Sequence, residues 1–342
     1  MRVRNPGSHI LSACTALAVL AACSGGTSLT APSPLSQIPI AGSPNGSSSQ
    51  GLPRFNAGDA NAPGLIFASL PQSNTVDIFS QGRKHKMVGQ ITTGLNSPLG
   101  LATDATGNLY VANQNVPTVP VYAPPYTGAP FLTLDAAGNL PQGVAVSAHG
   151  VVAALNYCNT SSCDVPYVVS FYAKGSTKLC VTVPVSGNGI DGIAEGGSFD
   201  DAGNLYLVGQ VANSPDQFIG EIKGGCKAKK TVLLTTNTAL GHLSDVHVDK
   251  ADRIAILGLD SSIIDTYNPP KHGSLGSPVS TTTLGGSSGA FSFAFLASGQ
   301  DLYANIDLAG AYEYAYPAGG APESQVKLAN IGSVTVSPPL IP

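Results

Sequence analysis

The sequence repeats one pattern with a period that few folds can accommodate. One copy reads "PLGLATDATGNLYVAN" from Pro98 to Asn113, and related strings begin at Pro141, Phe199, Asp245 and Phe291. Each unit ends in an apolar or aromatic residue followed by a turn, at Phe79, Tyr122, Tyr172, Ile222, Tyr267 and Tyr314. Successive members of this series lie 43 to 50 residues apart. Four short strands with their turns fill such a length, which predicts one β-propeller blade per unit.

The number of units predicts six blades and the way in which the ring closes. Second strands of the "GNLYVAN" type are expected to start at Leu65, Leu109, Val151, Leu205, Ile254 and Leu302. Innermost strands are expected near positions 99, 142, 197, 244, 291 and 332. The strand at 65–69 has no inner strand before it, and the strand at 332–337 has no outer strands after it. We therefore predict an all-β, six-bladed propeller over residues 59–342, closed by pairing of the C-terminal strand with the N-terminal blade.

Composition agrees with this fold and argues against one class of partner. The chain has 40 Gly and 26 Pro, only 11% charged residues, and a net charge of −4. Its Asp-rich segments, 104–108 and 201–204, are predicted to be hairpin turns, because they lack the spacing and closing Glu of a calcium loop. Arg83, Lys84 and Lys86 form one small basic cluster. Without a basic stripe, nucleic acid is not expected as a partner.

The first residues indicate export. Arg2 and Arg4 precede the uncharged segment 10–22, which is shorter than the about 20 residues that span a bilayer. The segment ends in "LAAC", which resembles the signal of bacterial lipoproteins. This resemblance implies a signal peptide over residues 1–22, cleavage before Cys23 and a lipid on that cysteine. Ser24, rather than Asp, resembles outer-membrane sorting, so we expect a lipid-anchored protein of the cell envelope; ordinary secretion with a chance cysteine is the alternative.

A tether is predicted between the anchor and the propeller. Residues 24–58 include 6 Gly, 8 Ser and 5 Pro and a single charge at Arg54. Such a segment buries too little apolar surface to offset the entropy of ordering. We therefore expect residues 23–58 to form a flexible linker with a mean span of roughly 30–35 Å.

Four cysteines remain after residue 23, and their even number in an exported chain favours disulfides. Four cysteines allow three pairings. We favour Cys158–Cys163, which closes the short loop "CNTSSC", together with Cys180–Cys226, which joins the outer parts of consecutive blades. A zinc site made of all four is the alternative, and it requires the two pairs to converge.

Candidate site residues cluster where two consecutive inner strands begin. The propeller topology places these entry segments at one mouth of the central channel, a common ligand site. The candidates there are Asp191, Glu195, His242, Asp245 and His247, with Asn113 and Asn156 added from their positions at the ends of second strands. A histidine beside carboxylates suits general acid–base chemistry or a metal. The alternative is a set of polar loop residues satisfied by backbone groups and water.

The "P-x-G-[LV]-A" strand followed by "D-x-x-G-N-L-Y-V-A" resembles NHL-type six-bladed propellers and their gluconolactonase-like relatives. The resemblance implies, for the gluconolactonase-like members, one divalent metal in the channel held by carboxylates and two Asn. Asp191, followed by Gly192, matches one of these ligands. Leu99 and Gln142 stand before glycines where Asn would be expected, and the Glu-Gly-Pro of the first blade is missing.

We therefore expect a lipid-anchored module that binds a protein, a glycan or a small molecule, without a cofactor. The alternative function is a metal-dependent lactone hydrolase or a lyase, with a divalent cation such as calcium in the central channel.

Overall fold

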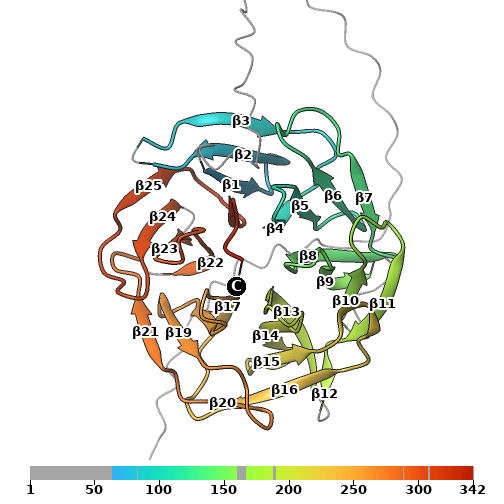
Figure 1. Ribbon diagram of the computed structural model, residues 1–342, viewed down its shortest axis with the longest axis vertical. Helices are drawn as coiled ribbons and strands as arrows, with labels where there is room; N and C mark the ends of the chain where they lie inside the picture. Colours follow the sequence, from blue (N-terminus) through green and yellow to red (C-terminus); the bar gives the residue numbers. More distant parts are fainter. Residues whose placement is uncertain are drawn as a thin grey trace, which may run out of the picture. The chain divides into compact units, whose positions relative to one another are not determined.

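The computed structural model describes residues 64–82, 84–159, 167–187, 190–287, 289–306 and 309–341. These residues form 26 β-strands and one short 3₁₀ turn, arranged as six sheets in a ring (Figure 1). The predicted six-bladed β-propeller is thus confirmed. The predicted signal peptide (1–22), the lipidation site Cys23 and the tether (23–58) lie outside the described residues.

Within each blade, the strands are named in order from the innermost to the outermost. Blade 1 consists of β26 (Val334–Ser337), β1 (Leu65–Leu70), β2 (Thr75–Ser80) and β3 (Met87–Ile91). Blade 2 consists of β4 (Pro98–Thr103), β5 (Leu109–Asn113), β6 (Thr118–Tyr122) and β7 (Leu132–Asp135). Blade 3 consists of β8 (Asn139–Val146), β9 (Val152–Asn159), β10 (Val168–Tyr172) and β11 (Leu179–Pro184).

Blade 4 is the most elaborate. It consists of β13 (Ile190–Phe199), β14 (Leu205–Val211), β15 (Gln217–Ile222) and β16 (Thr231–Thr236), with the short β12 (Ser186–Gly187) beside β13 and the 3₁₀ turn η1 (Gly225–Lys227) before β16. Blade 5 consists of β17 (Leu243–Val248), β18 (Ile254–Gly258), β19 (Ile263–Tyr267) and β21 (Ser280–Thr283). The connection between β19 and β21 contains a further short strand, β20 (Ser274–Gly276), which pairs in parallel with β16 of blade 4. Blade 6 consists of β22 (Ala290–Phe295), β23 (Asp301–Ile306), β24 (Gly310–Ala315) and β25 (Ser324–Lys327).

Hydrophobic packing occurs between blades rather than within them. Six clusters of buried apolar side chains are present in the described residues, and each joins two neighbouring blades. Because both faces of a blade are covered, its middle strands are apolar throughout instead of alternating; β5, "LYVAN", is buried at every position. Each blade therefore depends on both neighbours for its core.

The ring closes as the sequence predicts. β26 pairs antiparallel with β1, with Leu65 opposite Ser337 and Ala68 opposite Val334. Thr103 of β4 donates a hydrogen bond to the Val336 carbonyl at 2.5 Å. On the other side, the Val334 N–H donates to Ser292 Oγ of β22 at 3.2 Å. The last strand thus contacts blades 1, 2 and 6.

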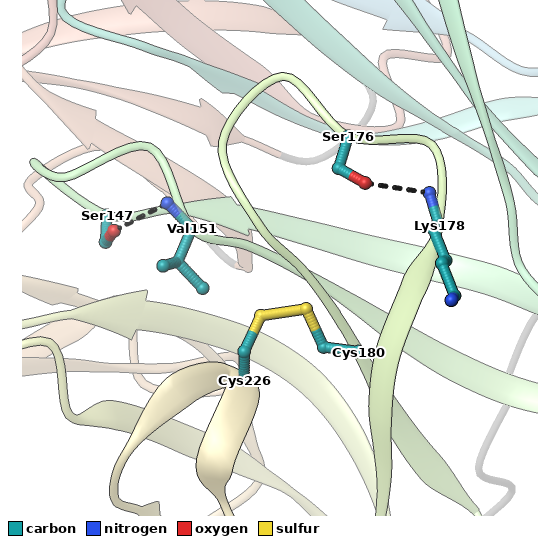
Figure 2. The surroundings of a disulfide bond; sticks show 6 residues. All are labelled: Ser147, Val151, Ser176, Lys178, Cys180 and Cys226. Atoms are coloured by element: carbon teal, nitrogen blue, oxygen red, sulfur yellow. Dashed lines mark hydrogen bonds between the residues drawn. A yellow bond between two sulfur atoms is a disulfide. The ribbon is translucent and has the colours of Figure 1, made fainter.

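Two further connections hold neighbouring blades together at their outer parts. Tyr122 donates a hydrogen bond to the Thr93 carbonyl of the preceding blade, and Tyr172 donates in the same way to Asp135, both at 2.6 Å. The predicted disulfide Cys180–Cys226 is confirmed; it links β11 of blade 3 to η1 of blade 4 (Figure 2). The other expected pair, Cys158–Cys163, cannot be followed in the same way, because Cys163 and the side chain of Cys158 lie outside the described residues.

Aspartates shape the turns between first and second strands. Asp104 Oδ1 accepts the N–H groups of Thr106 and Asn108, both at 2.9 Å, which confirms the predicted turn. In blade 4 the capping carboxylate is Asp200, which lies one residue before the predicted turn at 201–204; its Oδ1 accepts the Asn204 N–H at 2.7 Å. The carboxylates are thus engaged by their own turns.

Candidate functional site

Five innermost strands carry a β-bulge at an equivalent position, four residues before the last residue of the strand. In β8, Pro141 faces Asn156 and Gly143 faces Leu155, which leaves Gln142 without an opposite residue. The corresponding bulged positions in the other strands are Leu99 with Gly100 in β4, Glu195 in β13, Ser244 in β17 and Phe291 in β22. A bulge interrupts the hydrogen-bond ladder between two strands and changes the direction of the bulged side chain. Bulges are over-represented beside functional sites.

The bulges of neighbouring blades lie at one level of the ring. A Cβ added to Gly100 would lie 2.6 Å from the Cα of Gly143, and one added to Gly196 would lie 2.6 Å from the Cα of Asp245. A Cβ at Gly143 would in turn lie 3.5 Å from the Glu195 carbonyl oxygen. Glycines therefore allow adjacent inner strands to approach closely at the bulges. We call these bulged residues, 99–100, 142, 195, 244 and 291, the bulge belt; it lies at the end where the inner strands begin, the predicted channel mouth.

Glu195 is the belt residue with the most unusual electrostatic environment. Its side chain is half-buried, and its carboxylate has no hydrogen-bond or ion-pair partner among the residues that the structure describes. Burial raises the pKa of Glu195 from 4.5 to about 7. A carboxyl group with a pKa near neutrality suits either proton transfer or pairing with a charged ligand.

Asp245 and His247 lie together, as predicted, but Asp245 is engaged in holding blades together. Its Oδ1 accepts the Val246 N–H at 2.8 Å, and its Oδ2 accepts the Phe293 N–H of blade 6 at 3.0 Å. His247 Nε2 is 3.4 Å from Asp245 Oδ2. The His247 ring also packs edge-on against Phe293, with centroids 4.7 Å apart. These contacts give Asp245 and His247 a structural role at the interface of blades 5 and 6.

Asp191 and His242 lie at the rim of the same end of the ring. The Asp191 side chain is exposed, and its carbonyl accepts the Ala212 N–H at 2.8 Å. His242 is half-buried, and its carbonyl accepts the Leu259 N–H at 2.7 Å. No group of three or more His, Cys, Asp or Glu that would hold a metal ion is found within the described part of the chain. The assignment of Asp191 as a metal ligand stays a prediction.

The predicted asparagines sit at the ends of second strands and bind backbone nearby. Asn113 accepts the Asn96 N–H at 3.0 Å and donates to the Gly94 carbonyl at 3.0 Å, so it fixes the segment that enters β4. Asn156 donates to Ser170 Oγ at 3.0 Å, and its buried Oδ1 has no partner among the described residues.

Four of the five bulges carry residues that were not expected as site candidates from the sequence: Leu99 with Gly100, Gln142, Ser244 and Phe291. Phe291 is 41% exposed although it lies in an innermost strand, Gln142 is half-buried, and Ser244 donates to the Ala290 carbonyl of blade 6 at 2.9 Å. The only local signal for two of the bulges is the string Pro-x-Gly, at positions 98–100 and 141–143. A small cleft lies against blade 5, lined by Leu240, Leu243, Ile256, Ile263, Asp265 and Tyr267.

Comparison with known proteins shows the fold and no more. No protein-family model matches the sequence, and no curated protein does. A protein of unknown function from Bacteroides caccae has a similar structure, with a TM-score of 0.57 and 11% identity over 81% of this chain and 99% of that chain. A functionally unknown protein from Desulfotomaculum acetoxidans DSM 771 has a TM-score of 0.51 and 13% identity over 80% of this chain and 99% of that one. At such identities the likeness concerns architecture alone.

Proposed function

We propose that this chain is a lipid-anchored binding module of the bacterial cell envelope and that its ligand contacts the bulge belt. The carrying observation is the belt itself: five inner strands leave the regular ladder at one level and present different side chains there. Among these are the exposed Phe291 and Glu195, whose carboxylate has no partner among the described residues. An aromatic anchor beside a few polar groups is the usual composition of a ligand site.

The rest of the ring is suited to hold such a site rigidly. Belt glycines pack backbone against backbone, and the interblade hydrogen bonds of Asp245 and Ser244 fix blades 5 and 6 beside the belt. A rigid scaffold lowers the ordering cost of binding. The NHL-type resemblance of the repeat strings is consistent with a module of this kind, because that fold hosts many binding functions.

A thermal-shift survey with cell-envelope glycans, peptides and small metabolites tests the proposed site. At least one compound class should raise the melting temperature of the wild-type chain, because a ligand stabilises the state that binds it. Phe291→Ala and Glu195→Gln should abolish that shift. Val279→Ala and Glu323→Gln alter exposed residues away from the belt and should keep it. A shift that survives both belt variants would place the ligand elsewhere.

The anchor is tested separately by metabolic labelling with radioactive palmitate. The wild-type chain should incorporate the label and sediment with membranes. Cys23→Ser should remain unlabelled and soluble after export. Label in Cys23→Ser would contradict lipidation at this residue.

An enzyme remains the second candidate, and the Glu195 carboxyl favours it. A pKa of about 7 matches that of a general acid or base at neutral pH. In the metal-dependent form of this proposal, a divalent cation would polarise a lactone carbonyl, with Asp191 as one expected ligand. Elemental analysis after dialysis tests it: a divalent ion retained by the wild type and lost in Asp191→Ala would favour the hydrolase. Lactone turnover unchanged by Glu195→Gln would argue against a catalytic role of Glu195.

A further inference from the structure

Most of the cationic side chains that the structure describes lie on one face of the propeller. In blades 2 to 6, the connections between first and second strands and between third and fourth strands lie at the end opposite the bulge belt, as does the β2–β3 connection of blade 1. We call them the far connections. Every Lys and Arg that the structure describes lies in a far connection, except Lys327 in β25. The connections at the belt end contain no Lys or Arg among their described residues, whereas they contain the exposed acids Asp216 and Asp260.

Half of these cations form one group on blades 3 and 4. Its members, here called the lysine patch, are Lys174, Lys178, Lys223, Lys227, Lys229 and Lys230, and all of them are exposed. The β10–β11 connection carries the first two, and the β15–β16 connection carries the other four. The disulfide Cys180–Cys226, with its Cα atoms 5.1 Å apart, draws the two connections together; Figure 2 shows Lys178 on the Cys180 side of this bond.

Most of the patch charge is not neutralised within the protein. Lys223 pairs with Glu221 at 3.2 Å, and the other five lysines form no ion pair with the residues that the structure describes. Two far-face carboxylates, those of Asp200 and Asp249, are engaged by their own turns, and Asp249 also binds Arg253 at 2.6 Å. Asp201 and Glu323 are exposed in other far connections, outside the two that carry the patch. The patch therefore presents a local positive field on a protein whose net charge is −4.

The chain enters the propeller on this same face. The carbonyl of Gly64 accepts the N–H of Gln81, in the β2–β3 far connection, at 2.7 Å. Leu65, the first residue of β1, stands opposite Ser337, where β26 ends on the side away from the belt. A membrane anchor attached ahead of Gly64 would consequently draw the far face toward the bilayer.

We propose that the lysine patch docks the far face on anionic phospholipid headgroups, so that the bulge belt faces away from the membrane. The proposal deepens the proposed function, since it rests on an envelope location. Its physical basis is charge complementarity: each lysine close to an anionic bilayer surface strengthens binding about fivefold. This attraction acts within a Debye length of about 8 Å at physiological salt. The entry of the chain on the far face favours a lipid surface over a nucleic acid.

Vesicle sedimentation of the mature chain, from residue 23 and carrying Cys23→Ser, tests the docking without the anchor. Residues 51–342 form a compact unit of their own, so this chain keeps the whole propeller. The patch variant combines Lys227→Ala, Lys229→Ala and Lys230→Ala. The control variant combines Ser73→Asp, Asn115→Asp and Asn237→Asp in belt-end connections, which gives the same change in net charge at exposed positions.

We expect the wild type and the control to bind vesicles that contain phosphatidylglycerol, and to bind less as salt is raised. The patch variant should bind these vesicles about 10- to 100-fold more weakly. Lys174→Ala with Lys178→Ala, on the other side of the disulfide, should weaken binding in the same direction. Equal binding by patch variant and control would overturn the proposal, as would equal binding to pure phosphatidylcholine or tighter binding to duplex DNA than to vesicles. Since Cys23 is replaced throughout, failure here leaves the belt and the lipid anchor untouched.

Discussion

Shortening the two buried valines of β26 to alanine should destabilise the entire propeller, although β26 has only four residues. Val334 and Val336 are 2% and 1% exposed and pack in the cluster between blades 6 and 1. Each substitution removes two methyl groups, which costs about 1.6 kcal/mol in lost burial. A cavity that does not collapse adds up to about 1.2 kcal/mol per site. The double variant should therefore lose about 3–5 kcal/mol, short of strict additivity because the two sites share one cluster.

Urea unfolding followed by far-ultraviolet circular dichroism measures this loss, since the chain has no Trp to report by fluorescence. The midpoint of the double variant should fall by about 1 M or more. Val279→Ala is the matched control, because the same methyl groups are removed from a side chain that is 49% exposed. That control should stay within about 0.5 kcal/mol of the wild type.

Two results would refute the reasoning about closure. If the double variant unfolded at the wild-type midpoint, β26 would not be part of the cooperative unit. If a small early transition appeared while the main transition stayed in place, β26 would be a detachable appendage rather than the strand that seals the ring. A single transition at lower urea is the outcome that Val334 and Val336 predict from their contacts with blades 1 and 6.

Three more outcomes can be measured with the same assay. Gly196→Ala should cost about 1–3 kcal/mol because its Cβ would press on neighbouring backbone, whereas Gly241→Ala, with nothing within 4 Å, should be nearly neutral; equal effects would contradict the close approach at the belt. Burial raises the pKa of Glu195 from 4.5 to about 7, so the folded chain binds more protons between these values and stability falls as pH rises through them. In Glu195→Gln, the free energy of unfolding should fall by about 1–3 kcal/mol less over this pH range than in the wild type. If the variant and the wild type showed the same pH dependence of stability, this reasoning would be wrong. Replacing Cys180 and Cys226 by Ala opens a loop with a sequence separation of 46 and should cost about 4 kcal/mol, with an unchanged midpoint as the contrary result.

The fold was predictable because a propeller repeats its constraints in every blade. The strands starting at Leu65 and Leu302 were located by comparison with the clear copy at Leu109, and the structure places strands there. Closure of the ring followed from counting the strands of each blade. The first strand of the chain lacks an inner neighbour and the last strand lacks an outer one, so the two can pair with each other. Repetition thus supplies long-range information that a single local pattern does not contain.

The site was less predictable because it depends on register. Glu195 was found by its charge, but Gln142 and Phe291 occupy equivalent bulges and carry no chemical signal that separates them from ordinary strand residues. Asp245 is the opposite case: its charge marks it as a site candidate, but in the structure it holds blades 5 and 6 together. Its role depends on the N–H of Phe293, which lies 48 residues further along the chain, and no local pattern reveals that partner.

The charge asymmetry shows how topology turns a sequence pattern into a surface. In an up-and-down propeller, successive connections alternate between the two faces, so a chain that places its lysines in every second connection becomes basic on one face only. The two lysine runs, 174–178 and 223–230, are equivalent connections of consecutive blades. The Cys180–Cys226 bond then joins the runs into one patch, at a distance from the belt set by the length of the blades. Under the proposed function, this separation lets the propeller bind its support with one face while the other face stays open to a ligand.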